Sequence, residues 1–192
     1  MTLRGHRLLS GLLVLLSLAY PFAVYYGLQT IQPRWLGLML LTLLVLRYGL
    51  MGLRFVMNMA WVEWLGVMLL ASLATAISLS NRAELLLYYP IAVSSIMLML
   101  FARTLWAPPS MIERFARLRE PALPPAAVHY TRQVTKVWCG FFLLNALVAL
   151  ATTLHSRQAW LVYNGLVSYA LMGVLFLGEM LVRKRVKAGA AA

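Results

Sequence analysis

Long apolar runs alternate along the chain with short segments that carry most of its charge. An apolar run of about 17 to 25 residues is long enough for a helix to cross the hydrocarbon core of a bilayer. The pattern predicts about six such helices and leaves one long polar segment, residues 107–136, between the fourth and the fifth. The predicted spans are residues 8–28, 35–53, 60–79, 85–106, 137–154 and 158–182.

The first apolar run has a second interpretation. It follows a basic start, and residues 17–19 (Ser-Leu-Ala) suit a cleavage site of a secretory signal peptide. The run continues past this point through Tyr25 and Tyr26, which favours a span that is retained. Cleavage would leave five spans and would not change the orientation of these spans in the membrane.

Composition supports a membrane protein. Hydrophobic residues make up 62% of the 192 residues and charged residues 11%, which is far more apolar than a soluble domain. The fold class predicted is therefore all-α, a polytopic membrane helix bundle forming a single transmembrane domain over residues 1–187. Residues 188–192, which are small, are predicted to be a disordered tail.

The basic residues are distributed unevenly between the two predicted sides. The predicted spans place 14 of the 17 Lys and Arg residues on the side of the termini and of segment 107–136, and 3 on the other. The positive-inside rule then puts both termini and that segment in the cytoplasm. This distribution is typical of membrane orientation and not of a nucleic-acid surface.

Segment 107–136 predicts a short amphipathic helix. Ser110 and Glu113 have the spacing of a capping box, and Pro121 ends the helix that follows. Glu113 and Arg117 form an i,i+4 pair. The apolar face is expected in the cytoplasmic head-group boundary or against the spans, and it comprises Met111, Ile112, Phe115 and Leu118; the other face carries Glu113, Arg114 and Arg117. The fifth helix is expected to begin as early as Ala126.

The same segment supplies a candidate binding surface. Clustered arginines attract acidic proteins or anionic lipid head groups. Orientation in the membrane and lipid contact are the simpler explanation of the same charges. The residues of this candidate surface are Glu113, Arg114, Arg117, Arg119, Tyr130 and Arg132.

Three polar residues within or beside the spans are also candidates, because burial of such groups in lipid is costly. Glu63 lies between Trp61 and Trp64, and either an ion pair with a nearby arginine or a role in proton transfer would explain it. Asn145 and Asn164 are expected to form hydrogen bonds between helices. Asn145 also shares one helical face with Thr131, Thr135, Trp138 and Phe142, which predicts either a packing face or a polar groove.

The residues for most catalytic chemistry are missing or badly spaced. The three histidines lack metal-ligand spacing, the sequence contains no aspartate, and no glycine-rich phosphate loop is present. Cys139 and His129 are ten residues apart on one predicted helix, about 15 Å along its axis. We therefore predict no metal, no cofactor and no catalytic residue.

Four sequence segments carry a resemblance to a known family. They are LYYP (87–90), IERFARLREPALPP (112–125), HYTRQVTKVWCGFFLLN (129–145) and YNGLVSYALMGVLFLGEMLVRKRV (163–186). Between residues 87 and 186 the chain resembles small polytopic inner-membrane proteins from bacterial clusters that make aryl polyene or xanthomonadin-type lipids. The resemblance implies acyl carrier proteins or acyl-activating enzymes as partners. It implies no catalytic residues.

Members of that family are sometimes labelled ketosynthase, and this sequence does not support that label. Condensing enzymes are soluble and depend on a cysteine with two histidines in a thiolase-like fold. Cys139 lies in a predicted span without such partners.

Three hypotheses follow from the sequence. The first is an accessory protein, more a scaffold than an enzyme, that presents acyl intermediates at the cytoplasmic face for aryl-polyene-type lipid biosynthesis. The second is a subunit of a lipid or small-molecule transporter, with a water-accessible path near Glu63, Asn145 and Asn164. The third is a membrane enzyme that acts on acyl or polyprenyl chains, for which Glu113, His129 and Tyr130 are the available residues.

Overall fold

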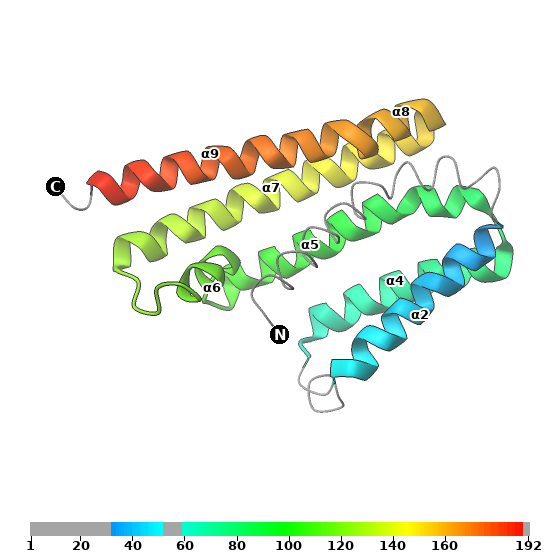
Figure 1. Cartoon of the computed structure of the whole chain (residues 1–192), viewed down its shortest axis with the longest axis horizontal. Coiled ribbons are helices and arrows are strands. Elements are labelled where there is room, and N and C mark those ends of the chain that lie inside the picture. Colours follow the sequence, from blue (N-terminus) through cyan, green and yellow to red (C-terminus); the bar gives the residue numbers. More distant parts are fainter. Residues whose placement is uncertain (1–31, 52–58, 190–192) are drawn as a thin grey trace, which may run out of the picture. The chain divides into compact units, whose positions relative to one another are not determined.

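The computed structural model describes residues 32–51 and 59–189, and the regular structure of these residues is helical (Figure 1). Residues 33–150 form one compact unit, and residues 151–189 belong to a second. The first unit contains α2 (Pro33–Met51), α4 (Trp61–Ser80), the 3₁₀ helix η1 (Ala83–Tyr88), α5 (Tyr89–Trp106), α6 (Met111–Arg117) and most of α7 (Pro125–His155).

Within the described residues, four helical segments are long and apolar enough to cross a membrane: Trp61–Ser80, Ala83–Trp106, Pro125–His155 and Arg157–Arg183. Between 11% and 33% of each apolar window is buried, so most apolar side chains face outward. Such surfaces suit lipid rather than water. These segments agree with the predicted third to sixth spans and indicate a multi-pass membrane protein.

The two remaining predicted spans are described incompletely or not at all. Helix α2 covers the predicted second span as far as residue 51. The predicted first span and residues 52–53 lie outside the described residues.

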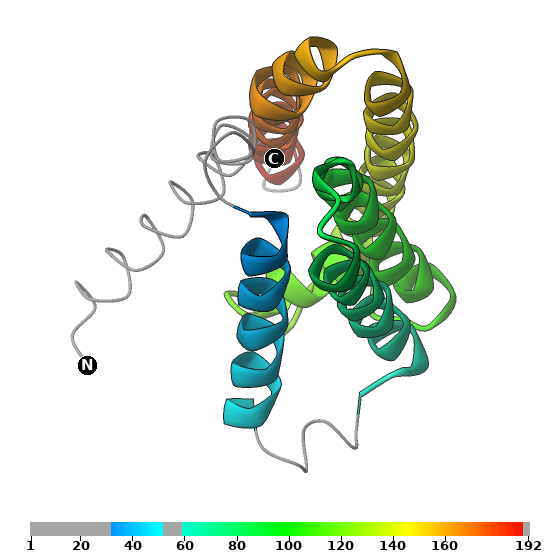
Figure 2. The ribbon, with the colours of Figure 1, turned by 90° about the vertical axis from the view of Figure 1, so that its right-hand side faces the viewer.

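In the unit formed by residues 33–150, successive long helices run in opposite directions (Figures 1 and 2). Helix α4 packs against both α2 and α5. Helix α6 lies where α5 ends and α7 begins, and it contacts α5.

Helices α2 and α4 approach closely where α2 begins and α4 ends. A Cβ atom added to Gly37 would lie 2.8 Å from the carbonyl oxygen of Ala74 and would also collide with Ser78. Asn81 ends α4 in the left-handed conformation (φ 51°), and its Oδ1 accepts a hydrogen bond of 3.0 Å from the backbone N–H of Arg34. Small residues therefore let the two backbones meet at this end.

The fourth predicted span begins as a 3₁₀ helix. Pro90 lies in the first turn of α5, directly after η1. Proline is tolerated in the first turn of an α-helix, where an N–H would have no partner inside the helix. Pro90 therefore marks the change from 3₁₀ to α-helix and does not break the span.

Helix α7 is longer than the predicted span 137–154. It has 31 residues, or about 46 Å at 1.5 Å per residue, which exceeds the roughly 30 Å of a hydrocarbon core. The boundary of segment 107–136 is therefore corrected, because the connection between α6 and α7 ends before Pro125. The early start expected near Ala126 is confirmed.

In the second unit, residues 157–189 form one continuous helical run. Ser156 separates it from α7, and its Oγ accepts a hydrogen bond of 3.1 Å from the N–H of Ala159. The run contains α8 (Arg157–Val162), the π-helix η2 (Tyr163–Val167) and α9 (Ser168–Gly189). It continues two residues into the predicted tail, and residues 190–192 lie outside the described residues.

The close approach of α2 and α4 generates a prediction about stability. We expect Gly37→Ala to destabilise the protein by about 1–3 kcal/mol, because the new methyl group collides with backbone atoms of α4. Gly49→Ala in the same helix is the matched control, since nothing lies within 4 Å of a Cβ atom there. Thermal unfolding in detergent measures both variants. Equal melting temperatures for the two variants would contradict the close approach.

Candidate functional site

Two threonines hold α6 between α5 and α7. The Oγ1 atom of Thr104, in α5, accepts a hydrogen bond of 2.9 Å from the N–H of Met111. The Oγ1 atom of Thr135, in α7, accepts one of 3.2 Å from the N–H of Ile112. Each hydroxyl also donates to a carbonyl of its own helix, at 2.7 and 2.8 Å. Amides that have no acceptor inside α6 thus bind both neighbouring helices.

A buried carboxylate also lies within α6. Glu113 is 5% exposed, and its Oε1 accepts from Nε and Nη2 of Arg117 at 2.9 and 2.7 Å. Its Oε2 accepts from the N–H of Ser110 at 3.3 Å. Arg117 also donates through Nη1 to the carbonyl of Pro121, 2.9 Å away. The predicted i,i+4 pair is confirmed, as is the bond from Ser110 to Glu113 expected from the capping box.

The burial of α6 differs from the prediction. The apolar face was expected in the head-group boundary or against the spans, with Glu113 on the opposite face. In the structure Glu113 and Ala116 are buried, whereas Phe115 is 55% and Leu118 82% exposed. Of the two places expected for the apolar face, packing against the spans is therefore wrong for Phe115 and Leu118. The reason is electrostatic: Arg117 and a backbone N–H satisfy the carboxylate, which makes its burial tolerable.

The remaining charges of this region are mainly positive and exposed. Between residues 103 and 136 the sequence has six basic and two acidic residues. Arg114, Arg119, Arg132 and Lys136 are exposed. Arg114 and Arg132 are each fixed by a hydrogen bond of 3.0 Å to a backbone carbonyl, so part of this charge is held in place. Tyr130, another predicted surface residue, is half-buried in α7.

Aromatic rings of α5 and α7 pack against each other near α6. Phe101 of α5 packs near Trp138 and Phe142 of α7, with ring centroids 6.4 and 5.1 Å apart. Phe141 extends the cluster, 5.7 Å from Trp138. Such edge-to-face and tilted contacts contribute stability beyond the area that they bury.

One polar contact lies deeper along the same helix pair. Nδ2 of Asn145 donates to Oγ of Ser94 at 2.9 Å, and both side chains are buried. The buried face of α7 comprises Thr131, Thr135, Phe142, Asn145 and Ala149. The burial of these side chains favours the packing interpretation of this face over the polar groove. The interhelical bond expected for Asn145 is confirmed.

The other polar candidates lie elsewhere. Glu63 is half-buried, and its Oε2 accepts from the N–H of Ala60 at 2.7 Å, which caps the first turn of α4. Arg54, one possible ion-pair partner of Glu63, lies outside the described residues. Asn164 is buried in η2, and its Nδ2 donates to the carbonyl of Trp160, in the same helical run, at 3.0 Å.

The described residues bring together no group of three His, Cys, Asp or Glu side chains that would hold a metal ion. His129 is exposed on α7, with Nε2 3.3 Å from Nε2 of Gln133. Cys139 is half-buried further along α7. Among the described residues, the polar side chains near α6 therefore form hydrogen bonds that hold α6 between α5 and α7.

Comparison with known protein families, with curated proteins and with solved structures gives no match to the chain.

Two residues of the site are not apparent from the sequence. Thr104 and Ser94 lie in an apolar span where neither type stands out. Their importance depends on which residues of α7 face them. Threonine and serine within a span are a weak signal for interhelical hydrogen bonds.

The contact between Thr135 and Ile112 generates a prediction about dynamics. Thr135→Val keeps the shape of the side chain but removes the acceptor, so the half-buried amide of Ile112 loses its partner. We expect hydrogen exchange of the amides of α6 to accelerate about 10- to 100-fold. Thr42→Val is the matched control, because that hydroxyl binds a carbonyl of its own helix, α2. Unchanged exchange in α6 would show that Thr135 does not hold it.

The buried contact between Asn145 and Ser94 generates a second prediction. A double-mutant cycle with Asn145→Ala and Ser94→Ala should give a coupling energy of about 0.6 kcal/mol, with roughly 1.7 kcal/mol as an upper bound. Ser72→Ala replaces Ser94→Ala in the control cycle, because Ser72 is exposed and binds its own helix. Unfolding in detergent measures the four stabilities. Equal coupling in both cycles would exclude the contact.

Proposed function

We propose that the protein is an accessory protein of the bacterial inner membrane for aryl-polyene-type lipid biosynthesis. In this proposal acidic acyl carrier proteins dock on the α6 surface, which we define as Arg114, Arg119, Arg132 and Lys136 with helix α6. The carriers then present their acyl intermediates at the membrane. The kind of lipid comes from the family resemblance of residues 87–186, and the docking site from the described contacts.

The observation that carries the proposal is the excess of exposed basic side chains around α6. The buried pair of Glu113 with Arg117 neutralises one acid and one arginine, which leaves five basic residues and one acid, Glu120, between residues 103 and 136. This excess gives a locally positive potential. A positive patch attracts an acidic partner and accelerates its association.

The rigidity of α6 adds support. Its first amides bind Thr104 and Thr135, so the loop is ordered by two helices before any partner arrives. A surface that is already ordered loses little conformational entropy on binding. The positive-inside distribution would place this surface in the cytoplasm, where carrier proteins work.

The two other hypotheses receive less support. A transport path through Asn145 requires contact with water, but that side chain is buried and bonded to Ser94. A catalytic role for Glu113 requires an available carboxylate, but both of its oxygens accept hydrogen bonds. Accessory docking is therefore the function that we favour.

Charge reversal tests the proposal. We expect Arg114→Glu with Arg119→Glu to lower the affinity for an acyl carrier protein about tenfold or more, since rim charges govern the electrostatic attraction. The measurement is a titration of the carrier against the protein in nanodiscs at low and high salt. Arg117 is left intact, because its reversal would leave the buried Glu113 unpaired.

The control for that experiment is Arg34→Glu with Arg82→Glu. It changes the net charge equally at the opposite end of the first unit. We expect the control to bind the carrier like the unmodified protein. Equal affinities of all three proteins, or binding that does not weaken with salt, would contradict docking on the α6 surface.

A further inference from the structure

Helices α2 and α4 form a wedge. They meet closely at Gly37, as described above, and separate toward the end where α2 finishes and α4 begins (Figure 2). There an open hollow of about 230 Å³ lies between them. Leu44, Val45 and Tyr48 of α2 line one side of it, and Trp64, Val67 and Ala71 of α4 line the other.

The lining of the hollow indicates a hydrocarbon ligand. Its exposed surface is almost entirely apolar. Pockets for drug-sized ligands usually enclose about 300–1,000 Å³, so the present volume suits a slimmer molecule. One unbranched hydrocarbon chain satisfies both the chemistry and the size.

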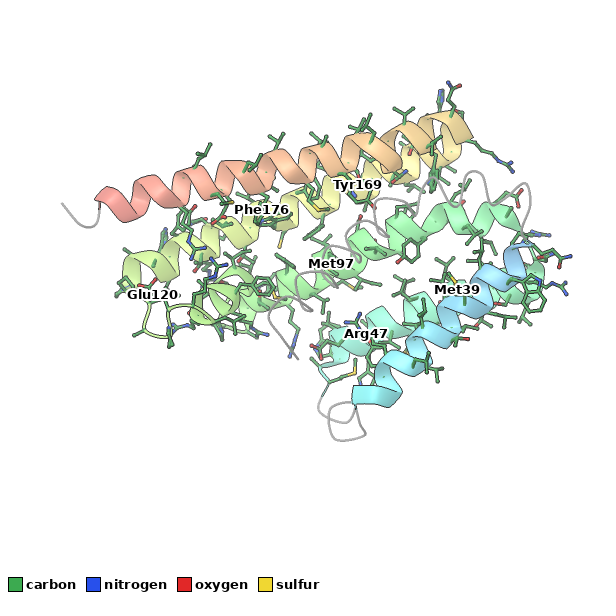
Figure 3. The ribbon with its side chains drawn as sticks, viewed as in Figure 1. Met39, Arg47, Met97, Glu120, Tyr169 and Phe176 are labelled. Carbon is green, nitrogen blue, oxygen red and sulfur yellow. The ribbon has the colours of Figure 1, made fainter. Side chains whose placement is uncertain are left out.

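A positive charge lies at the open end of the wedge. Arg47 directly precedes Tyr48 and is exposed (Figure 3). Glu63, the acidic residue in the first turn of α4, directs one carboxylate oxygen to the N–H of Ala60. The partial positive charge of that helix N-terminus stabilises the Glu63 carboxylate in this position. An anionic head group at the mouth of the hollow therefore finds Arg47 as its counter-charge.

We propose that this hollow binds a single-chain fatty acid, with the hydrocarbon chain between α2 and α4 and the carboxylate at Arg47. One slim hollow beside one arginine matches one chain with one carboxylate. This site uses α2 and α4 and not the α6 surface, so it stands or falls independently of carrier docking.

Photocross-linking with a diazirine analogue of palmitic acid tests the site. The full-length protein in nanodiscs of zwitterionic lipid is irradiated with the probe, and the modified peptides are mapped by mass spectrometry. We expect adducts on the lining of the hollow, between residues 41 and 48 and between residues 59 and 71. Ala71→Phe fills the hollow and should reduce these adducts at least about fivefold.

The chain offers matched controls for the hydrocarbon and for the head group. Ala76→Phe makes the same change at an exposed position of α4, and it should leave labelling unchanged. Arg47→Gln should reduce labelling, whereas Arg34→Gln, at the closed end of the same helix, should not. Unaltered helicity and melting temperature in detergent establish that each variant is folded.

Three results would overturn the proposal. Equal labelling of the Ala71→Phe and Ala76→Phe variants would show that the hollow holds no chain. Equal labelling of the Arg47→Gln and Arg34→Gln variants would remove the carboxylate contact. Displacement of the probe by excess phosphatidylglycerol but not by excess palmitate would assign the hollow to a phospholipid instead.

Discussion

The packing of α5 against α7 is the contact on which the α6 surface depends. Asn145 and Ser94 bond within the helix pair, and the ring of Phe101 packs against Phe142 nearer to α6. These contacts set the register that brings Thr104 and Thr135 to the same end, where each accepts an amide of α6. In lipid a buried polar group has no water to replace its partner. The position of α5 along α7 therefore has few alternatives of similar energy.

The contacts of α6 with α5 and α7 also determine which charges are exposed at this end of the unit. Because α6 is fixed from both sides, Glu113 is held inward and meets Arg117, and the exposed arginines remain outside without that acid. Phe115 and Leu118 are exposed beside them, which suits the boundary between lipid and water. Order, charge and exposed apolar side chains thus come from one set of hydrogen bonds, and together they favour a docking surface near the membrane.

The sequence predicts the features that depend on neighbouring residues. The spans from Trp61 onward, the bond from Ser110 to Glu113 and the pair of Glu113 with Arg117 all follow from local spacing. The inward position of Glu113 does not, because it depends on where α5 and α7 place α6. The partnership of Asn145 with Ser94 and the hollow between α2 and α4 likewise depend on helix registers that periodicity leaves open.

Photocross-linking from a single position shows whether an acyl carrier protein reaches the α6 surface. A photoreactive amino acid in place of Arg119 reports in living cells which molecules reach the α6 surface, and the same amino acid in place of Arg82 reports on the opposite end. Docking on the α6 surface predicts adducts with an acyl carrier protein from position 119 and not from position 82. Adducts with lipid alone from position 119, or the same carrier adducts from both positions, would contradict it.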